Sequence, residues 1–325
     1  MTCRFPRRPQ FVIVSPRQSG GGAIVLHALA KYASELGYRA RVFYPGERKY
    51  EPGRKAFFWR QQIVFTITDV ARVMLVKLFG EKPFLNNPLF KGYVNVSVRG
   101  VARKWLPRVT NDDVVVYSDN IVGNPLHATH VVRWLLYHYT YKDRPGVAYS
   151  ESDVFYCYMQ PFNDVDLNPQ GRQLTTPYYD LELYKQTNFG ERAGTCYVIR
   201  KGADRPDLPE SFDGIVVDDL SEVEKVRVFN ECKYCVSYDM QTAYSTLASI
   251  CGCISVVVPE PGKTYDDYYA EDYKMYGVAF GFDPEQLAYS ERTRSDALAY
   301  YAARNEESRA QARAFVEDCK ELFFS

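Results

Sequence analysis

The chain has 325 residues, 46% of them hydrophobic and 25% charged, which is the balance of a soluble globular protein with room for two domains. No apolar run reaches the roughly 20 residues of a membrane-spanning helix, and the opening residues lack the apolar core of a secretory signal, so we expect a cytosolic protein. The net charge of zero conceals an asymmetry, because residues 1–110 hold 20 Lys and Arg against 5 Asp and Glu, whereas the remainder holds 20 against 35.

The first predicted unit alternates strand, glycine-rich loop, helix and strand. An apolar run at 11–14 predicts a buried strand, and three glycines follow it at 20–22. Apolar residues then recur at helical spacing over 25–36, and a second apolar run covers 40–44. This order is the building block of a Rossmann-like sheet.

The rest of the N-terminal half is less regular. Residues 70–78 suggest a helix, and residues 93–98 alternate like a strand. A valine-rich run at 113–117 predicts a buried parallel strand. Asn124 and the proline after it have the form of a helix N-cap and first helical residue, which predicts a helix continuing to residue 139.

Beyond residue 195 the pattern is a regular alternation, which predicts a second parallel sheet with crossover helices. Ser221 and Glu224 form a capping box that opens one helix, and another is expected over 242–251. Strands are expected at 195–199, 215–217, 234–237 and 254–258.

We therefore expect an α/β protein with two Rossmann-like domains, and we place them at 1–190 and 191–295, followed by a terminal helix at 296–325. Ligands bind at the carboxyl ends of the strands in open parallel sheets. Two such domains are expected to face each other across a cleft lined by these strand ends.

The most informative segment covers residues 235–260. A strand there ends in a polar turn, and the helix that follows begins with small and hydroxyl residues. Its first turn offers unpaired backbone N–H groups and the positive end of the helix dipole, which suit a diphosphate. The hydroxyl groups of Thr242, Tyr244 and Ser245 can add further donors.

This segment resembles the donor-binding segment of GT-B glycosyltransferases, in which two glutamates eight residues apart precede a glycine and an apolar strand. With Gly252 on the family glycine, Asp239 stands at the first acid and Leu247 at the second. The second acid, which typically holds the donor's ribose in that family, is missing, and this indicates a divergent branch.

A second resemblance concerns the basic residue that often follows the first strand of the donor domain in these enzymes. Arg200 and Lys201 occupy that place, where they would neutralise the departing nucleoside diphosphate; a solvated turn is the alternative. The resemblance implies the GT-B fold, no bound catalytic metal and no cofactor besides the nucleotide-sugar substrate. It places on the donor side Arg200, Lys201, Asp239, Thr242, Tyr244, Ser245 and Glu260.

On the acceptor side, the resemblance places Gly20, Gly21 and Gly22 in the glycine loop of the cleft floor. This run lacks the spaced third glycine of a dinucleotide site, so a dehydrogenase is a poor alternative.

Asp119 is the candidate catalytic base because it follows a strand at its carboxyl end, although a plain turn residue fits equally. Asn124 is assigned to the cleft. His127 is the second candidate base or an ordinary surface residue, and His130 is expected at the surface.

Four cysteines superficially resemble a metal site: Cys232, Cys235, Cys251 and Cys253. Two of them lie in apolar runs, and free buried thiols explain the pattern better than zinc, which stays the alternative.

The basic N-terminal region predicts an anionic partner. No nucleic-acid-binding module is recognisable, so we expect peripheral attachment to an anionic membrane. Docking of the basic half against the acidic half is the alternative. Aromatic residues 57–59 lie within the basic cluster, whose members are Arg7, Arg8, Arg48, Lys49, Arg54, Lys55 and Arg60.

Residues 119–133 and 230–260 also resemble proteins of bacterial surface-polysaccharide assembly. The implied function is transfer of a sugar from a nucleotide-sugar to a glycan or lipid-linked acceptor at the inner face of the membrane. Two alternatives keep the two-domain plan: a non-catalytic glycan-binding subunit, which the loss of the acid at Leu247 favours, and a nucleotide-sugar epimerase.

Overall fold

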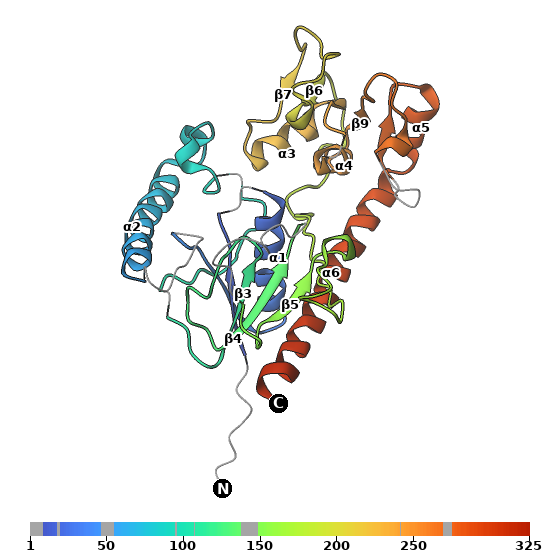
Figure 1. Cartoon of the computed structure of the whole chain (residues 1–325). Coiled ribbons are helices and arrows are strands. Elements are labelled where there is room, and N and C mark those ends of the chain that lie inside the picture. The colour runs from blue at the N-terminus through green and yellow to red at the C-terminus, as the bar shows by residue number, and fades with distance from the viewer. Residues whose placement is uncertain are drawn as a thin grey trace. The chain divides into compact units, whose positions relative to one another are not determined.

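A computed structural model describes residues 9–17, 20–46, 55–94, 96–106, 108–137, 149–240, 242–268 and 275–325. The chain divides into two compact units, one formed by residues 1–178 with 304–325 and the other by residues 179–303 (Figure 1). The first unit is called unit 1 below and the second unit 2.

Unit 1 is built on a parallel sheet of five strands in the order β2-β1-β3-β4-β5. Helix α1 (Gly21–Glu35) connects β1 to β2, and α1 and the last helix, α6 (Arg294–Phe324), bury the same face of this sheet. Trp134 and Phe315 are among the largest side chains of that core. The strands are β1 (Gln10–Val14), β2 (Arg39–Phe43), β3 (Asp113–Ser118), β4 (His130–Leu135) and β5 (Val154–Cys157).

Long connections complete unit 1. The longest contains helix α2 (Lys55–Phe79), whose second half is the helix predicted at 70–78. Ile121 and Leu126, in the connection from β3 to β4, cover the sheet face opposite α1. Short 3-10 helices are η2 (Lys82–Phe84), η3 (Pro88–Phe90) and η4 (Gln160–Phe162).

The helix predicted from Asn124 to residue 139 is wrong, because β4 occupies its centre. Val131, Val132 and Leu135 are buried, and a short buried apolar run fits a strand as well as a helix. Asn124 does not cap a helix, since its side chain closes a turn by bonding both backbone groups of Ala128. The strand predicted at 93–98 is also wrong for the described residues there, which hold only an isolated bridge between Lys91 and Val94.

Unit 2 has the alternation that the sequence predicts, with five parallel strands in the order β10-β9-β8-β6-β7. Ser221 and Glu224 form the predicted capping box of α3, and Thr242 caps α4. The elements are β6 (Thr195–Val198), η5 (Arg200–Gly202), β7 (Ile215–Val216), α3 (Glu222–Glu231), β8 (Tyr234–Ser237), α4 (Ala243–Ile250), β9 (Ile254–Val257), η6 (Tyr265–Asp267), β10 (Val278–Phe280) and α5 (Pro284–Arg292). The chain is therefore an α/β protein with two parallel sheets, consistent with two Rossmann-like units.

Two further observations bear on the sequence predictions. In the described part of the chain, no helix combines the length and the apolarity that crossing a membrane requires. The cysteines of the suggested metal quartet, Cys232, Cys235, Cys251 and Cys253, are buried free thiols in or beside the apolar core of unit 2.

Candidate functional site

The carboxyl end of the unit 2 sheet carries an exposed cation directly after β6. Arg200 adopts a left-handed backbone conformation with φ of 40°, which few residues other than glycine adopt. The Asp218 carboxylate holds this turn, accepting from the backbone N–H of Arg200 at 2.7 Å and of Ile199 at 3.1 Å. Lys201 follows and is also exposed. Both cations are therefore presented at the strand end, as the sequence predicts.

The Arg200 side chain leans over the next strand end and the start of α4. Its guanidinium lies 5.1 Å from the centre of the Tyr244 ring, and its Nε lies 3.9 Å from Oδ2 of Asp239. Asp239 follows β8, and its side chain is only 3% exposed, whereas that of Arg200 is 45% exposed. The acid thus holds an accessible cation beside the first turn of α4.

The first turn of α4 contains a buried hydroxyl that no described residue pairs. Thr242 caps the helix, its hydroxyl accepting from the backbone N–H of Tyr244 at 3.2 Å. Ser245 is 2% exposed, and its Oγ makes no hydrogen bond to any described residue. Leaving a buried polar group unpaired costs about 1–3 kcal/mol, so this position favours a bound water or ligand oxygen.

Tyr244 faces Arg200 with its ring, but its hydroxyl is committed within unit 2. It donates to Oε1 of the buried Glu222 at 2.8 Å, and burial, with Glu222 nearby, raises the pKa of Tyr244. Glu222 also accepts from Lys225 at 3.0 Å and from the Tyr184 hydroxyl at 2.6 Å. This network fixes α3 against α4. The sequence does not reveal this network, because a glutamate in the first turn of a helix is ordinarily explained by its favourable interaction with the helix dipole.

A second missed residue, Arg205, ties the strand ends together. Its guanidinium donates to the backbone carbonyls of Tyr238 at 3.2 Å, Val258 at 2.7 Å and Pro259 at 3.0 Å. These carbonyls follow β8 and β9, so one buried side chain sets the spacing of both turns. Glu260, the last predicted donor-side residue, comes directly after the second turn and is half-buried.

Leu247, which stands where the resemblance expects a second acid, is buried in the apolar core of unit 2. It contributes packing and no polar group. Among the described residues, no group of three or more His, Cys, Asp and Glu side chains has the geometry to hold a metal ion.

The carboxyl end of the unit 1 sheet brings Asp119 close to the glycine-rich turn. Burial raises the pKa of Asp119 to about 6, against the opposing effect of hydrogen bonds from backbone N–H groups, including those of Leu136 and Tyr137. A Cβ on Gly22, in the first turn of α1, would lie 3.4 Å from the Leu136 side chain. Gly20 and Gly21 lie at the start of the same helix, so the three glycines and Asp119 lie at one edge of the sheet.

His127 does not lie beside Asp119, and the Asn124 side chain is engaged in holding a turn. His127 is exposed, with φ of 52°, and comes three residues before the start of β4. Because β3 and β4 run parallel, a residue just before β4 lies towards the opposite end of the sheet from one just after β3. The Asn124 amide oxygen accepts from Ala128 N–H and from the Tyr117 hydroxyl, both at 3.0 Å, which is a structural role.

A buried polar network also lies at the carboxyl ends of β1 and β2. Nδ1 of His27 lies 2.6 Å from the Ala23 carbonyl, and its Nε2 lies 2.9 Å from the Tyr44 hydroxyl. Burial lowers the pKa of His27 to about 4, so the ring is neutral near pH 7. Arg17 packs over the Tyr44 ring at 4.1 Å and pairs with the fully buried Asp69 of α2 at 2.6 Å. A lone histidine inside an apolar helix gives no sequence signal for such a network.

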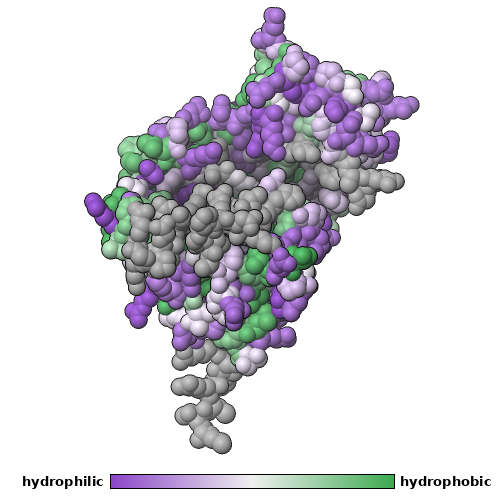
Figure 2. Space-filling view, viewed as in Figure 1, coloured by the Kyte–Doolittle hydropathy of each residue, from purple (hydrophilic) through white to green (hydrophobic). Residues whose placement is uncertain are grey.

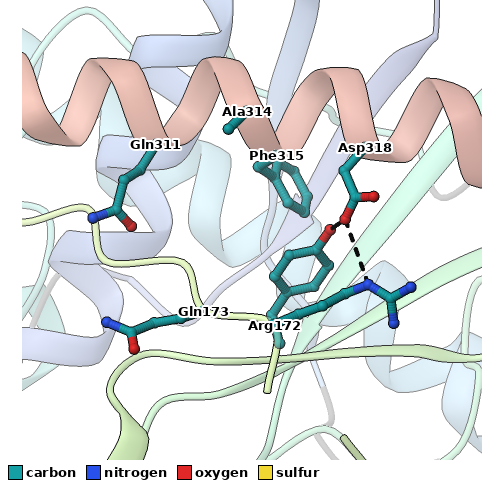
Figure 3. A pocket seen from close by; sticks show the side chains of 7 residues that line it. Arg172, Gln173, Gln311, Ala314, Phe315 and Asp318 are labelled. Carbon is teal, nitrogen blue, oxygen red and sulfur yellow. Dashed lines mark hydrogen bonds and ion pairs between the residues drawn. The ribbon is translucent and has the colours of Figure 1, made fainter. Parts of the chain in front are cut away.

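Unit 1 also has a cavity of about 440 Å³ between α6 and the chain after β5 (Figure 3). Asp318 accepts from the Tyr156 hydroxyl there and pairs with Arg172 at 3.5 Å. The two charged residues that line this cavity, Arg172 and Asp318, therefore neutralise each other. The lining residues are Tyr156, Arg172, Gln173, Gln311, Ala314, Phe315 and Asp318.

Comparison with known proteins gives no family for this chain. No family model matches it, and no curated protein matches it. Among solved structures it is similar to one described as the glycotransferase of kitacinnamycin, with 11% identity and a TM-score of 0.34 over 98% of this chain and 100% of the other. A similarity of this size assigns neither fold nor function, so function is inferred from the two sheet edges.

Proposed function

We propose that the chain is a glycosyltransferase of GT-B type that moves a sugar from a nucleotide-sugar to a hydroxyl group of a glycan or lipid-linked acceptor in surface-polysaccharide synthesis. Unit 2 binds the donor and unit 1 supplies the base. The observation that carries the proposal is the edge of unit 2, where the exposed Arg200 lies beside the first turn of α4 and the unpaired Ser245 hydroxyl.

The donor side acts through charge and hydrogen bonding. Backbone N–H groups at the start of a helix and the positive end of its dipole favour a diphosphate. Arg200 and Lys201 add two cations, which stabilise the nucleoside diphosphate as it leaves and supply the charge without a metal ion. Asp239 and Tyr244 keep the Arg200 guanidinium in place.

The acceptor side needs a group that takes a proton from the attacking hydroxyl. A carboxylate with a pKa of about 6 is ionised at neutral pH and is still a stronger base than an ordinary aspartate. The glycines at the start of α1 leave this edge without side chains that would block an approaching sugar.

A non-catalytic glycan-binding subunit is the second candidate. It is favoured by the buried Leu247, which stands where the resemblance expects the acid that holds the donor's ribose. Incubation of the purified protein with a panel of nucleotide-sugars separates the candidates. We expect slow release of nucleoside diphosphate from one donor, because water replaces the acceptor. Release from no donor would favour the binding subunit, and a changed sugar on an intact nucleotide would favour an epimerase.

A further inference from the structure

Helix α2 turns two polar side chains, Gln62 and Asp69, towards the protein. Gln62 is buried, its amide oxygen accepting from Gly46 N–H at 2.7 Å and its amide nitrogen donating to the Tyr44 carbonyl at 3.2 Å. Asp69, two helical turns further on and on the same face, is fully buried and pairs with both Arg17 and Arg103. Hydrogen bonds and ion pairs therefore help to attach this helix to unit 1.

The outward face of α2 is apolar. Ile63, Ile67, Met74 and Leu78 follow one another at helical spacing, so they form a single stripe along a helix of roughly 37 Å. In Figure 2, hydrophobic residues are visible on the side of the molecule where Figure 1 places α2. The members of this stripe are between 38% and 76% exposed: Phe57, Ile63, Val64, Ile67, Met74, Leu75, Leu78 and Phe79. Contiguous apolar surface on this scale marks an interaction site.

The exposed charges of residues 55–94, which hold the stripe, have one sign. Residues 55–94 contain two acids, of which Asp69 is buried and Glu81 is half-buried. The exposed cations are Arg60, Lys77, Lys82 and Lys91. Of the basic cluster predicted to bind a membrane, only Arg60 can be assessed, since Arg7, Arg8, Arg48, Lys49 and Arg54 and the side chain of Lys55 lie outside the described part. Phe58, expected at the membrane, is instead buried.

We infer that α2 lies flat in the surface of an anionic membrane, with its apolar stripe at the acyl boundary and the surrounding cations at the lipid phosphates. The apolar stripe then contacts the acyl chains, and the cations contact the lipid phosphates. A symmetric dimer through the same face would set identical cations against one another, and residues 55–94 offer no exposed acid to pair them, which favours the lipid surface. The inference does not depend on glycosyl transfer.

Co-sedimentation with vesicles tests this inference on the whole chain. We expect binding to vesicles that contain phosphatidylglycerol, weaker binding to phosphatidylcholine alone, and release by salt. The triple variant Ile63→Asn/Ile67→Asn/Leu78→Asn should lower the partition coefficient at least tenfold. The matched control, Val165→Asn/Val223→Asn/Leu298→Asn, removes exposed apolar side chains elsewhere and should change it less than twofold.

Three results would overturn the membrane assignment. They are failure of the protein to bind either vesicle, unchanged binding by the α2 variant, and a stable dimer in solution that this variant alone dissociates. The last result would mean that a second copy covers the stripe. Circular dichroism of both triple variants verifies that the altered residues, all exposed, leave the fold intact.

A cavity of about 430 Å³ at the amino end of the unit 1 sheet carries a second inference. Gln10 pairs with Arg39 and Val12 with Arg41 in the β1–β2 register, so these arginines lie on one face of the sheet. The cavity lies opposite the edge that holds Asp119. Its ionisable lining residues are Arg39, Arg41, Arg103, Lys104, Arg108 and Asp113.

The described residues do not supply enough acids to match the positive charge of this cavity. Arg103 pairs with Asp69, and the Asp113 carboxylate accepts from the N–H and hydroxyl of Thr110 at 2.6 and 2.9 Å. Burial lowers the pKa of Lys104, with Asp113 opposing this and two neighbouring arginines adding to it. The cations that form no ion pair with any described residue are Arg39, Arg41, Lys104 and Arg108.

The geometry points to a binding site for a phosphate-bearing anion in this cavity. Calorimetry with inorganic pyrophosphate tests it in an Arg200→Ala/Lys201→Ala background, which removes the donor edge. Adding Arg39→Ala/Arg41→Ala should weaken binding at least tenfold, whereas adding the control Arg227→Ala/Lys233→Ala should not. Equal affinity in both would overturn the site. Vesicle binding by the same variants distinguishes the ligand sources. If the site takes a lipid headgroup, Arg39→Ala/Arg41→Ala also weakens binding to phosphatidylglycerol vesicles. If it takes a soluble ligand, vesicle binding is unchanged.

Discussion

Replacing Arg200 and Lys201 together by alanine is expected to weaken nucleoside diphosphate binding by roughly 30- to 800-fold, or about 2–4 kcal/mol. A hydrogen bond to a charged group contributes about 1.5–3 kcal/mol, and the two contributions are not fully additive because both cations contact one diphosphate. Isothermal titration calorimetry on the purified protein measures the change directly.

A control variant is needed to show that weaker binding comes from the loss of these two contacts and not from the change in net charge or from unfolding. Arg227→Ala/Lys233→Ala removes the same net charge from unit 2, at an exposed helix position and before the amino end of β8. It should leave the affinity within about twofold. Thermal unfolding should show both double variants folded, since all four side chains are accessible. Unchanged affinity in the Arg200→Ala/Lys201→Ala variant would remove these residues from the donor site.

Unit 2 could be predicted from the sequence because local and tertiary preferences agree there. The capping box at Ser221 and Glu224, the cap at Thr242 and the Gly252 that ends α4 act within a few residues of the chain. Gly252 adopts φ of 106°, which side-chain-bearing residues rarely adopt. Short-range signals of this kind can be recognised in the sequence without knowledge of the fold.

Unit 1 is harder to predict from the sequence, because two of its elements depart from the usual hydrophobic periodicity. Strand β4 is buried on both faces, so its apolar residues lie on both sides of Arg133 without alternating and fit a helix equally well. Helix α2 places Gln62 and Asp69 inside and Ile67 outside, the reverse of an ordinary surface helix. Periodicity predicts the helix but not which face is buried, which is decided by the contacts of Gln62 and Asp69.

The positions of two candidate residues, Arg200 and Asp119, could be predicted from the sequence, because parallel strands deliver the residues that follow them to one edge. Asp239 is a candidate through the family resemblance, and the structure places it just after β8. Glu222 and Arg205 were missed because their roles depend on partners brought close only by folding. The pKa of Asp119 was equally out of reach, since it depends on burial at a position that sequence describes only as a turn.

The variant Asp119→Asn is expected to cut turnover by about 10²–10⁴ while donor binding stays intact, because asparagine cannot accept the proton of the acceptor hydroxyl. Steady-state transfer rates, with the donor that the nucleotide-sugar panel selects, measure the first effect, and calorimetry with nucleoside diphosphate measures the second. Wild-type kcat/KM should rise with pH through about 6, where the carboxyl group ionises. His127→Asn should retain near-normal turnover; if it loses turnover and Asp119→Asn does not, His127 is the base.

Stability gives an independent check on the same carboxyl group. Its pKa is raised from 3.8 to about 6, so the folded state holds the proton more tightly than the unfolded state does. The free energy of unfolding therefore falls as the pH rises from about 4 to 6, by up to about 3 kcal/mol. In Asp119→Asn this part of the decrease should disappear, leaving the variant more stable than the wild type at pH 8 by a similar amount in urea unfolding. A variant less stable at pH 8, with an unchanged pH dependence, would mean that Asp119 is an ordinary turn residue with no buried charge to use in catalysis.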